Sequence, residues 1–125
     1  MAVTVLSGTS GALYYKPAGT TGTFPETGVN TGTNVITTQA YLNLKAGDPV
    51  QFSVVNSQTG GAGSGTLPAG ISAATTYFVL TYTASTGALT VSATLGGSIL
   101  DITDDGTAVA PNEFQVAYEI GRAHV

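Results

Sequence analysis

The sequence predicts an all-β fold, either an antiparallel β-sandwich or a small barrel, with an extended N-terminal arm. Strand-forming residues, above all Thr, Val, Ile, Tyr and Phe, dominate the stretches between frequent glycines. Turn signals built from Gly, Pro, Asn and Asp recur about every 8–12 residues, which is typical of a sandwich or barrel. No stretch keeps the i, i+3, i+4, i+7 apolar spacing of an amphipathic helix, so essentially no helix is predicted.

Composition indicates one domain with few charges. The chain has 125 residues, enough for a single core but too few for two ordinary domains. Charged residues make up only 8%, against roughly 25% in soluble domains. Two interpretations fit this scarcity. Either another protein covers much of the surface, or the surface is of the neutral Thr/Ser-rich kind that is common in extracellular β-domains.

The charge balance argues against nucleic acid and membranes as partners. Net charge is −4, and the only basic residues are Lys16, Lys45 and Arg122, so the chain has no basic footprint for either. No apolar run approaches the roughly 18 residues of a membrane span, and the first residues lack the regions of a secretory signal. With no cysteine, no disulfide framework is expected.

The first region, residues 1–34, is predicted to hold two short strands and an arm. Residues 3–6 and 12–16 are the strand candidates, and Pro17 ends the second. Residues 18–34 form a run of Gly, Thr, Pro and Asn that is unusually long for a loop in a compact domain. This length favours an extended arm that becomes ordered against a neighbouring subunit.

Three residues are the candidate inter-subunit contacts of this arm: Phe24, Pro25 and Val29. Phe24, followed by Pro25, is an apolar anchor that a purely solvated loop does not need. The alternative is a mobile loop that carries one phenylalanine by chance.

Residues 35–119 are predicted to form one sandwich-like module. In its clearest strand Val50, Phe52 and Val54 alternate with polar residues and are expected to point inward. Short strands at 35–38 and 41–44, a turn at 46–49 and a flexible loop at 59–65 are also expected. The loop at 59–65 lacks the lysine of a phosphate-binding loop, so it is interpreted as a connection only.

Four turn signals organise the rest of the module into a compact antiparallel unit. They are Leu67-Pro68-Ala69-Gly70, Ser85-Thr86-Gly87, Gly96-Gly97 and Asp104-Asp105-Gly106, and Gly87 is the expected left-handed residue of a hairpin. Strands are predicted at 77–82, 89–93, 99–102, 107–110 and 114–118, so that the whole chain holds nine or ten.

The strand at 77–82 is apolar on both faces. Tyr77 and Val79 share one face, and Phe78, Leu80 and Tyr82 share the other. A central strand covered on both sides is therefore expected.

Side chains that perform catalysis or bind metals are sparse, so no enzyme, cofactor, metal site or small-molecule substrate is predicted. The lone histidine, His124, is next to last and has no nucleophile motif to serve. Asp101, Asp104 and Asp105 form the one carboxylate cluster, but they lack the alternate spacing and closing Glu of a calcium loop. A hairpin turn is the favoured interpretation of this cluster.

Tyrosines offer a second function, because aromatic rings can stack on sugars. The candidates are Tyr14, Tyr15, Tyr41, Tyr77, Tyr82 and Tyr118. Tyrosines in strands more often pack against the core or a sheet face, and tryptophan is absent. Carbohydrate binding is therefore the alternative and not the main prediction.

The segment LPAGISAATTYFVL, followed after a short connection by SATLGG, resembles a β-module of structural proteins in tailed bacteriophages. Modules of this kind occur in tail tube, tail fibre and capsid decoration proteins, and the resemblance covers roughly residues 47–118. The opening VLSGTSGALYYKPAG is similar to the start of a phage tail tube protein. The resemblance implies an Ig-like β-module within a virion.

Residues 120–125, which read IGRAHV, resemble one reading frame of a common sequencing-library adapter. They are predicted to be a non-native tail, so that the native chain would continue past Glu119. The alternative is an ordinary hydrophilic tail. No role is assigned to His124 or Arg122 on this basis.

These observations predict a structural virion protein, in the tail tube or as a decoration protein on the capsid surface. Its partners would be copies of itself and other virion proteins, held through the N-terminal arm and through neutral β faces. The alternative is a carbohydrate- or receptor-binding β-module of a phage fibre or adhesin.

Overall fold

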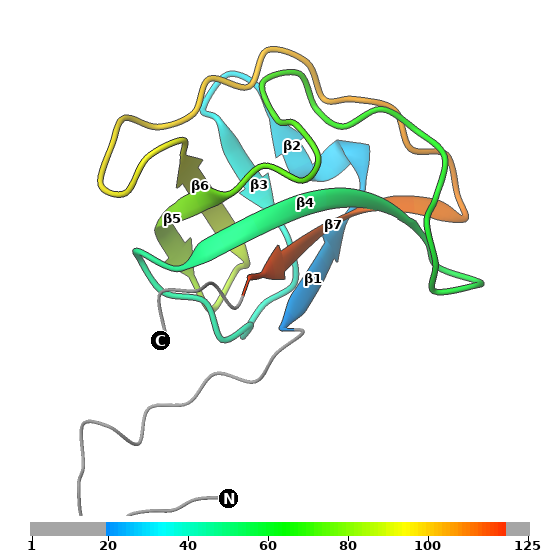
Figure 1. Cartoon of the computed structure of the whole chain (residues 1–125), viewed down its shortest axis with the longest axis horizontal. Coiled ribbons are helices and arrows are strands. Elements are labelled where there is room, and N and C mark those ends of the chain that lie inside the picture. Colours follow the sequence, from blue (N-terminus) through cyan, green and yellow to red (C-terminus); the bar gives the residue numbers. More distant parts are fainter. Residues whose placement is uncertain (1–19, 120–125) are drawn as a thin grey trace, which may run out of the picture.

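A computed structural model describes residues 20–119, which form a single antiparallel sheet of seven strands (Figure 1). The strands are β1 (Thr21–Phe24), β2 (Val29–Asn30), β3 (Val35–Thr37), β4 (Pro49–Asn56), β5 (Tyr77–Thr83), β6 (Ala88–Ser92) and β7 (Asn112–Tyr118). The one helical element among these residues is the single 3-10 turn η3 (Glu26–Gly28). The all-β prediction is confirmed, with seven strands in residues 20–119; two of the nine or ten strands expected for the whole chain lie before these residues.

The sheet curls so that its two ends meet. The strand order is β1-β7-β4-β5-β6-β3-β2, so β1 and β2 stand at opposite ends. Seven flat strands would hold those ends about 28 Å apart. Only residues 25–28 link β1 to β2, and a link of that length spans at most about 18 Å. The sheet therefore has the shape of a small barrel, one of the two predicted forms.

The segment from β1 to β2 closes this barrel by changing partners midway. β1 pairs with β7, η3 bends the chain, and β2 then pairs with β3. Beside the bend the Thr38 hydroxyl donates to the Thr23 carbonyl oxygen over 3.0 Å. A Cβ on Gly28 would lie 2.7 Å from the Thr37 carbonyl oxygen, so this close approach requires glycine.

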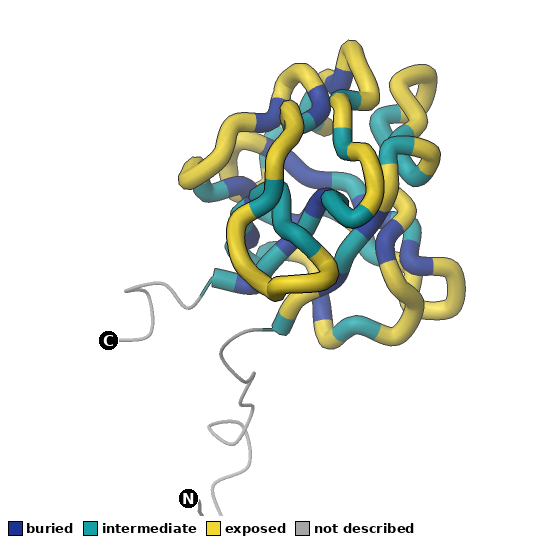
Figure 2. The backbone as a smooth tube through the Cα atoms, turned by 90° about the vertical axis from the view of Figure 1, so that its right-hand side faces the viewer, coloured by how far each residue is buried: buried dark blue, intermediate teal, exposed yellow. Residues whose placement is uncertain are grey.

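Inward-facing side chains from the strands fill the barrel. Phe24 packs against Phe114 and Phe52 with ring centroids 5.4 and 6.2 Å apart, and Phe52 also contacts Tyr77. Buried positions follow the strands, whereas the connections are mostly exposed (Figure 2). The buried hydrophobic strand residues are Phe24, Ile36, Val50, Phe52, Tyr77, Val79, Leu89, Val91, Phe114, Val116 and Tyr118. The predicted inward positions Val50 and Phe52 are confirmed, and Val54 is half-buried against this core.

A register shift in β5 changes which side its last residues face. Val79 pairs with Val91, but Thr81 pairs with Thr90, so one extra residue bulges out between them. Tyr82 therefore comes to lie opposite Leu89 and packs against the core. The predicted grouping of Tyr82 with Phe78 and Leu80 is wrong because the alternation is interrupted at the bulge.

Two long connections meet across one end of the barrel and form a cap, which we define as residues 61–76 and 99–110 (Figure 1). Thr66 and Thr107 exchange two backbone hydrogen bonds of 2.8 Å, which joins the ends of the predicted antiparallel unit. Pro68, Ile71 and Ile102 are the buried side chains of the cap. The cap closes the end of the barrel where β3 begins and β6 ends.

The prediction of an extended arm is wrong for residues 20–34. Phe24 is 1% exposed and lies in the core of its own chain, because Gly22 and Phe24 both face inward from β1. The predicted division after residue 34 falls inside the sheet, since β2 pairs with β3. Predictions for residues 1–19, including both early strands, and for the tail at 120–125 lie outside the described residues.

Three predicted strands are not strands, for two physical reasons. Residues 41–44 form an irregular turn because Tyr41 has a positive φ of 60°. Residues 99–102 and 107–110 make only isolated bridges, at Ile99 and at Thr107. The other backbone N–H groups of these residues each donate to a different segment of the chain, so no continuous ladder of hydrogen bonds forms.

Candidate functional site

The three predicted inter-subunit residues do not form one exposed surface. Phe24 is buried, and Val29 in β2 is half-buried and packs against the core. Pro25 is exposed at the bend between β1 and β2, where its carbonyl oxygen accepts from the Gly28 N–H over 2.9 Å. Two of the three therefore stabilise the fold of this chain, and only Pro25 is accessible to a partner.

The acidic cluster lies on the cap but does not form the predicted hairpin turn, because Asp104 and Thr107 each bridge to the other connection, at Ala69 and Thr66. The Asp104 carboxylate accepts a hydrogen bond of 2.7 Å from the Gly106 N–H, and the Asp104 backbone bridges to Ala69. Asp101 and Asp105 are exposed nearby in the sequence. Within residues 20–119 no three His, Cys, Asp or Glu side chains gather closely enough to hold a metal ion. Nor does any helix in this range have the length and hydropathy to cross a membrane.

Three side-chain hydrogen bonds join Gln51 of β4, Thr76 just before β5 and Glu119 just after β7. Glu119 accepts from the Thr76 hydroxyl over 2.6 Å and from the Gln51 amide over 3.2 Å. All three side chains are half-buried on the barrel wall. Because both carboxylate oxygens already have donors from neighbouring segments, this cluster ties β4, β5 and β7 together.

The tyrosines divide into core residues and one exposed residue. Tyr77 and Tyr118 are buried, and the Tyr77 hydroxyl accepts from the Ser72 N–H over 2.8 Å. Tyr82 is half-buried. Tyr41 is 78% exposed, more than any other large apolar or aromatic side chain in the described part of the chain. Tyr14 and Tyr15 lie outside that part.

The turn that carries Tyr41 is fixed from two sides. The Tyr82 hydroxyl donates to the Gln39 carbonyl oxygen over 2.5 Å and accepts from the Leu42 N–H over 2.9 Å. The Tyr41 N–H donates to the Ala84 carbonyl oxygen over 2.8 Å. The residues on both sides of Tyr41 are thus bonded to β5 and to the turn that follows it, while the Tyr41 ring points away from the core.

The turn after β5 approaches this segment closely. Gly87 has a φ of 83°, which confirms the predicted left-handed residue of the β5–β6 hairpin. The Gly87 carbonyl oxygen accepts from the Thr38 N–H, and a Cβ on Gly87 would collide with the Thr38 carbonyl oxygen. The two segments form one surface, the Tyr41 rim, which we define as residues 39–43 and 83–87.

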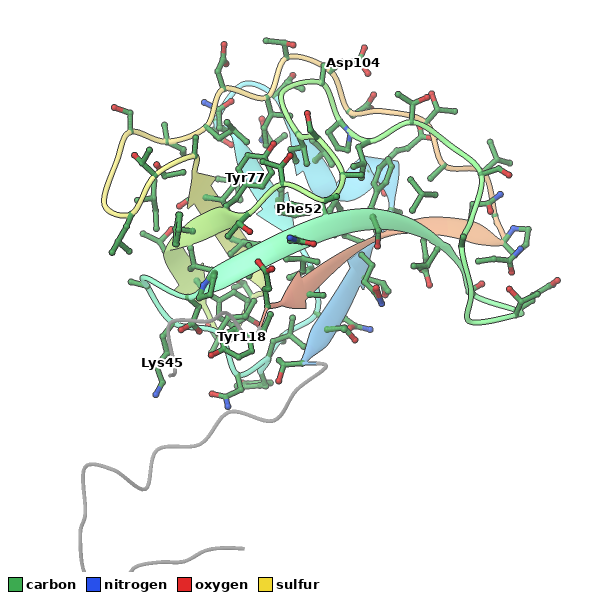
Figure 3. All side chains as sticks on the ribbon, viewed as in Figure 1. Lys45, Phe52, Tyr77, Asp104 and Tyr118 are labelled. Atoms are coloured by element: carbon green, nitrogen blue, oxygen red, sulfur yellow. The ribbon has the colours of Figure 1, made fainter. Side chains whose placement is uncertain are left out.

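The Tyr41 rim is uncharged, whereas the cap is acidic. The rim reads QAYLN and TASTG. The cap carries Asp101, Asp104 and Asp105, and Glu26 joins it by accepting from the Ala108 N–H over 2.6 Å. β6 begins at the rim and ends at the cap, so the two surfaces lie at opposite ends of the barrel. Asp104 accordingly lies far from Lys45 and Tyr118, which are near the rim end (Figure 3).

Comparison with known proteins adds no family to this description. No family model matches the chain, and searches of curated proteins and of solved structures returned no match. The site must therefore be judged on its geometry, which presents an exposed aromatic ring on a hydrogen-bonded turn within an uncharged surface.

Proposed function

We propose that this chain is a structural protein of a tailed-bacteriophage virion that assembles with copies of itself in the tail tube or on the capsid surface. The observation that carries the proposal is the scarcity of charge on the folded barrel. Residues 20–119 contain seven acidic residues and one lysine, so eight of these 100 residues are charged. Burying a neutral surface against a symmetry mate avoids the desolvation cost of ionised groups.

The fold also indicates which surfaces assembly would use. The strands at the two ends of the sheet are brought together by residues 25–28, so addition of strands at an open edge is disfavoured. Residues 20–34 belong to the barrel and are not available as an arm. The surfaces that remain for assembly are the outer faces of the barrel and the exposed connections, and copies could pack through the uncharged parts of these surfaces.

Electron microscopy of the purified protein and of its mixture with phage capsids tests this proposal. Tubes or rings would support a tail role, and density on the capsid surface would support a decoration role. A protein that stays monomeric at high concentration and binds no virion component would contradict both.

A carbohydrate- or receptor-binding module is the second candidate, and the exposure of Tyr41 is the observation that favours it. An accessible ring among hydroxyl and amide side chains is a surface on which a sugar can stack. A glycan array would be the first measurement. Binding that is lost in Tyr41→Ala but kept in a substitution at the cap would support this function.

A further inference from the structure

We propose that the Tyr41 rim is the contact surface between two copies of this chain, paired rim to rim about a two-fold axis. This assignment rests on the self-assembly proposed above and names one contact within it, because a two-fold pair closes on itself and a ring or tube needs further contacts. Four properties of the rim support it: backbone conformation, rigidity, apolar pattern and charge.

The backbone at Tyr41 is the first argument. A φ of 60° is uncommon for any residue with a Cβ and is an outlier for a bulky one. Glycine or asparagine would suit this turn better, and the ring gains little burial in return since it is 78% exposed. Such a conformation persists only where the surrounding structure holds it in place, and here the structure holds a large ring out toward solvent.

Rigidity is the second argument. The Tyr82 hydroxyl bonds to Gln39 and Leu42, and the Tyr41 N–H bonds to Ala84, so the turn around the ring is held in place before any partner arrives. A surface that is already ordered loses little conformational entropy on binding. Tyrosine on such a surface is among the residues that most often dominate a protein interface.

The pattern of side chains on the rim is the third argument, and it favours a protein over a sugar. Ala40 precedes Tyr41 in the chain and Ala84 accepts the hydrogen bond from the Tyr41 N–H, and both alanines are exposed, so small apolar groups lie near Tyr41. Polar residues, among them Gln39, Asn43 and Ser85, occupy the rest of the rim. An apolar centre with a polar periphery is the usual anatomy of a protein–protein contact.

Charge favours one orientation for two self-assembling copies. With seven acidic residues and one lysine, residues 20–119 carry a formal charge of −6 (1 − 7), so two copies repel each other over most of their surface. The rim has no charged residue, and the acidic cap is at the other end of the barrel. Rim-to-rim pairing keeps both caps in solvent and as far apart as the two barrels allow, whereas cap-to-rim stacking would bury carboxylates.

The test compares two glycine substitutions at matched backbone positions. Tyr41→Gly removes the ring, and Ala74→Gly changes an exposed residue of the cap that has nearly the same φ, 58°. Glycine tolerates positive φ, so neither variant should lose the fold. Sedimentation velocity over a concentration series of the full chain then measures the dissociation constant, and thermal unfolding checks the fold.

We expect Tyr41→Gly to raise the dissociation constant of the dimer roughly ten-fold or more, and Ala74→Gly to leave it unchanged. Ser85→Glu, which places like charges face to face across the rim, should weaken the dimer as well and should do so less at high salt. Self-association that is equal in the wild type and in both rim variants would overturn the rim but leave the proposed assembly intact.

Two other outcomes differ from equal self-association of the wild type and the rim variants. A wild-type chain that never self-associates contradicts the proposed assembly and the rim together. A monomeric wild type that binds a neutral glycan through Tyr41 overturns the rim contact in favour of the carbohydrate-binding function.

Discussion

At the residue scale, Phe24 links the closing strand to the core. Its ring is 1% exposed and contacts both Phe52 and Phe114, which belong to β4 and β7. An aromatic side chain in this position contributes several kcal/mol of burial to the folded state. Phe24 is therefore a structural residue of this chain, and a partner subunit has no access to its ring.

We expect Phe24→Ala to lower the free energy of unfolding by about 3–5 kcal/mol, because it leaves a cavity between two aromatic rings. Urea denaturation of the isolated chain measures this loss. If the variant does not fold, Phe24→Leu should show a smaller loss in the same direction. The matched control is Val109→Ala, which alters a side chain that is 68% exposed and should change stability by less than about 0.5 kcal/mol. An unchanged stability in Phe24→Ala would restore the arm interpretation.

The Tyr82 hydroxyl makes a second residue-scale prediction possible. Tyr82→Phe leaves the Gln39 carbonyl oxygen and the Leu42 N–H without this partner, at an expected cost of about 1–3 kcal/mol. Tyr41→Phe removes a hydroxyl from the exposed ring of the same rim and should have little effect. Equal stabilities of the two variants in chemical denaturation would show that the hydroxyl does not hold the rim together.

At the element scale, the strands with regular alternation were predictable and the others were not. Val50 and Phe52 in β4, and Phe114, Val116 and Tyr118 in β7, repeat every second residue. β1 has the same alternation, but Gly22 occupies one of its two inward positions and hides it. The bulge in β5 also left no mark in the pattern, because Thr81 and Leu80 are both common strand residues.

The rim could not be predicted for a related reason. Tyr41 follows a stretch of strand-forming residues, and nothing in its sequence context indicates a left-handed backbone, which usually appears at Gly or Asn. The hydrogen bonds that fix this turn come from Tyr82 and Ala84, more than 40 residues later. The candidate site thus depends on long-range contacts that only the fold supplies.

The Glu26 side chain attaches the cap to the segment that closes the barrel. Glu26 accepts from the Ala108 N–H, so Glu26→Ala should expose the amides of the cap to solvent exchange. Hydrogen exchange is expected to speed up roughly ten-fold or more at Ala108, while the amides of Phe52 and Val116 in the barrel keep their protection. Asp105→Ala changes an exposed carboxylate on the same cap and is the control. Equal protection of the Ala108 amide in both variants would show that the Glu26 hydrogen bond does not hold the cap.

At the scale of the whole molecule, the barrel has two unlike ends. One end carries the acidic cap, and the other carries the neutral rim together with the residues at which the described chain begins and ends. The Tyr118 N–H donates to the Thr20 carbonyl oxygen, so both of these residues lie on the same side. Two copies of the chain therefore present acidic or uncharged surfaces to each other, depending on which of their ends meet.

Deletions distinguish the barrel from a separate module at residues 35–119. Removal of residues 1–34 takes away β1 and β2, so we expect loss of cooperative unfolding. Removal of residues 1–19 leaves every described strand in place and should preserve a cooperative thermal transition, monitored by circular dichroism. A shorter chain, starting at residue 35, that melts cooperatively at the wild-type temperature would contradict the closed barrel.

The pairing of β1 with β7 has a consequence for synthesis of the protein. Thr21 pairs with Ala117, so the first described strand to leave the ribosome must wait for the last one. Contacts of such high sequence separation form slowly, and the sheet cannot close during translation until nearly 100 further residues have been made. Until then the Phe24 ring of β1 lacks its contact with Phe114 of β7, and the β1 edge of the nascent chain has no partner strand.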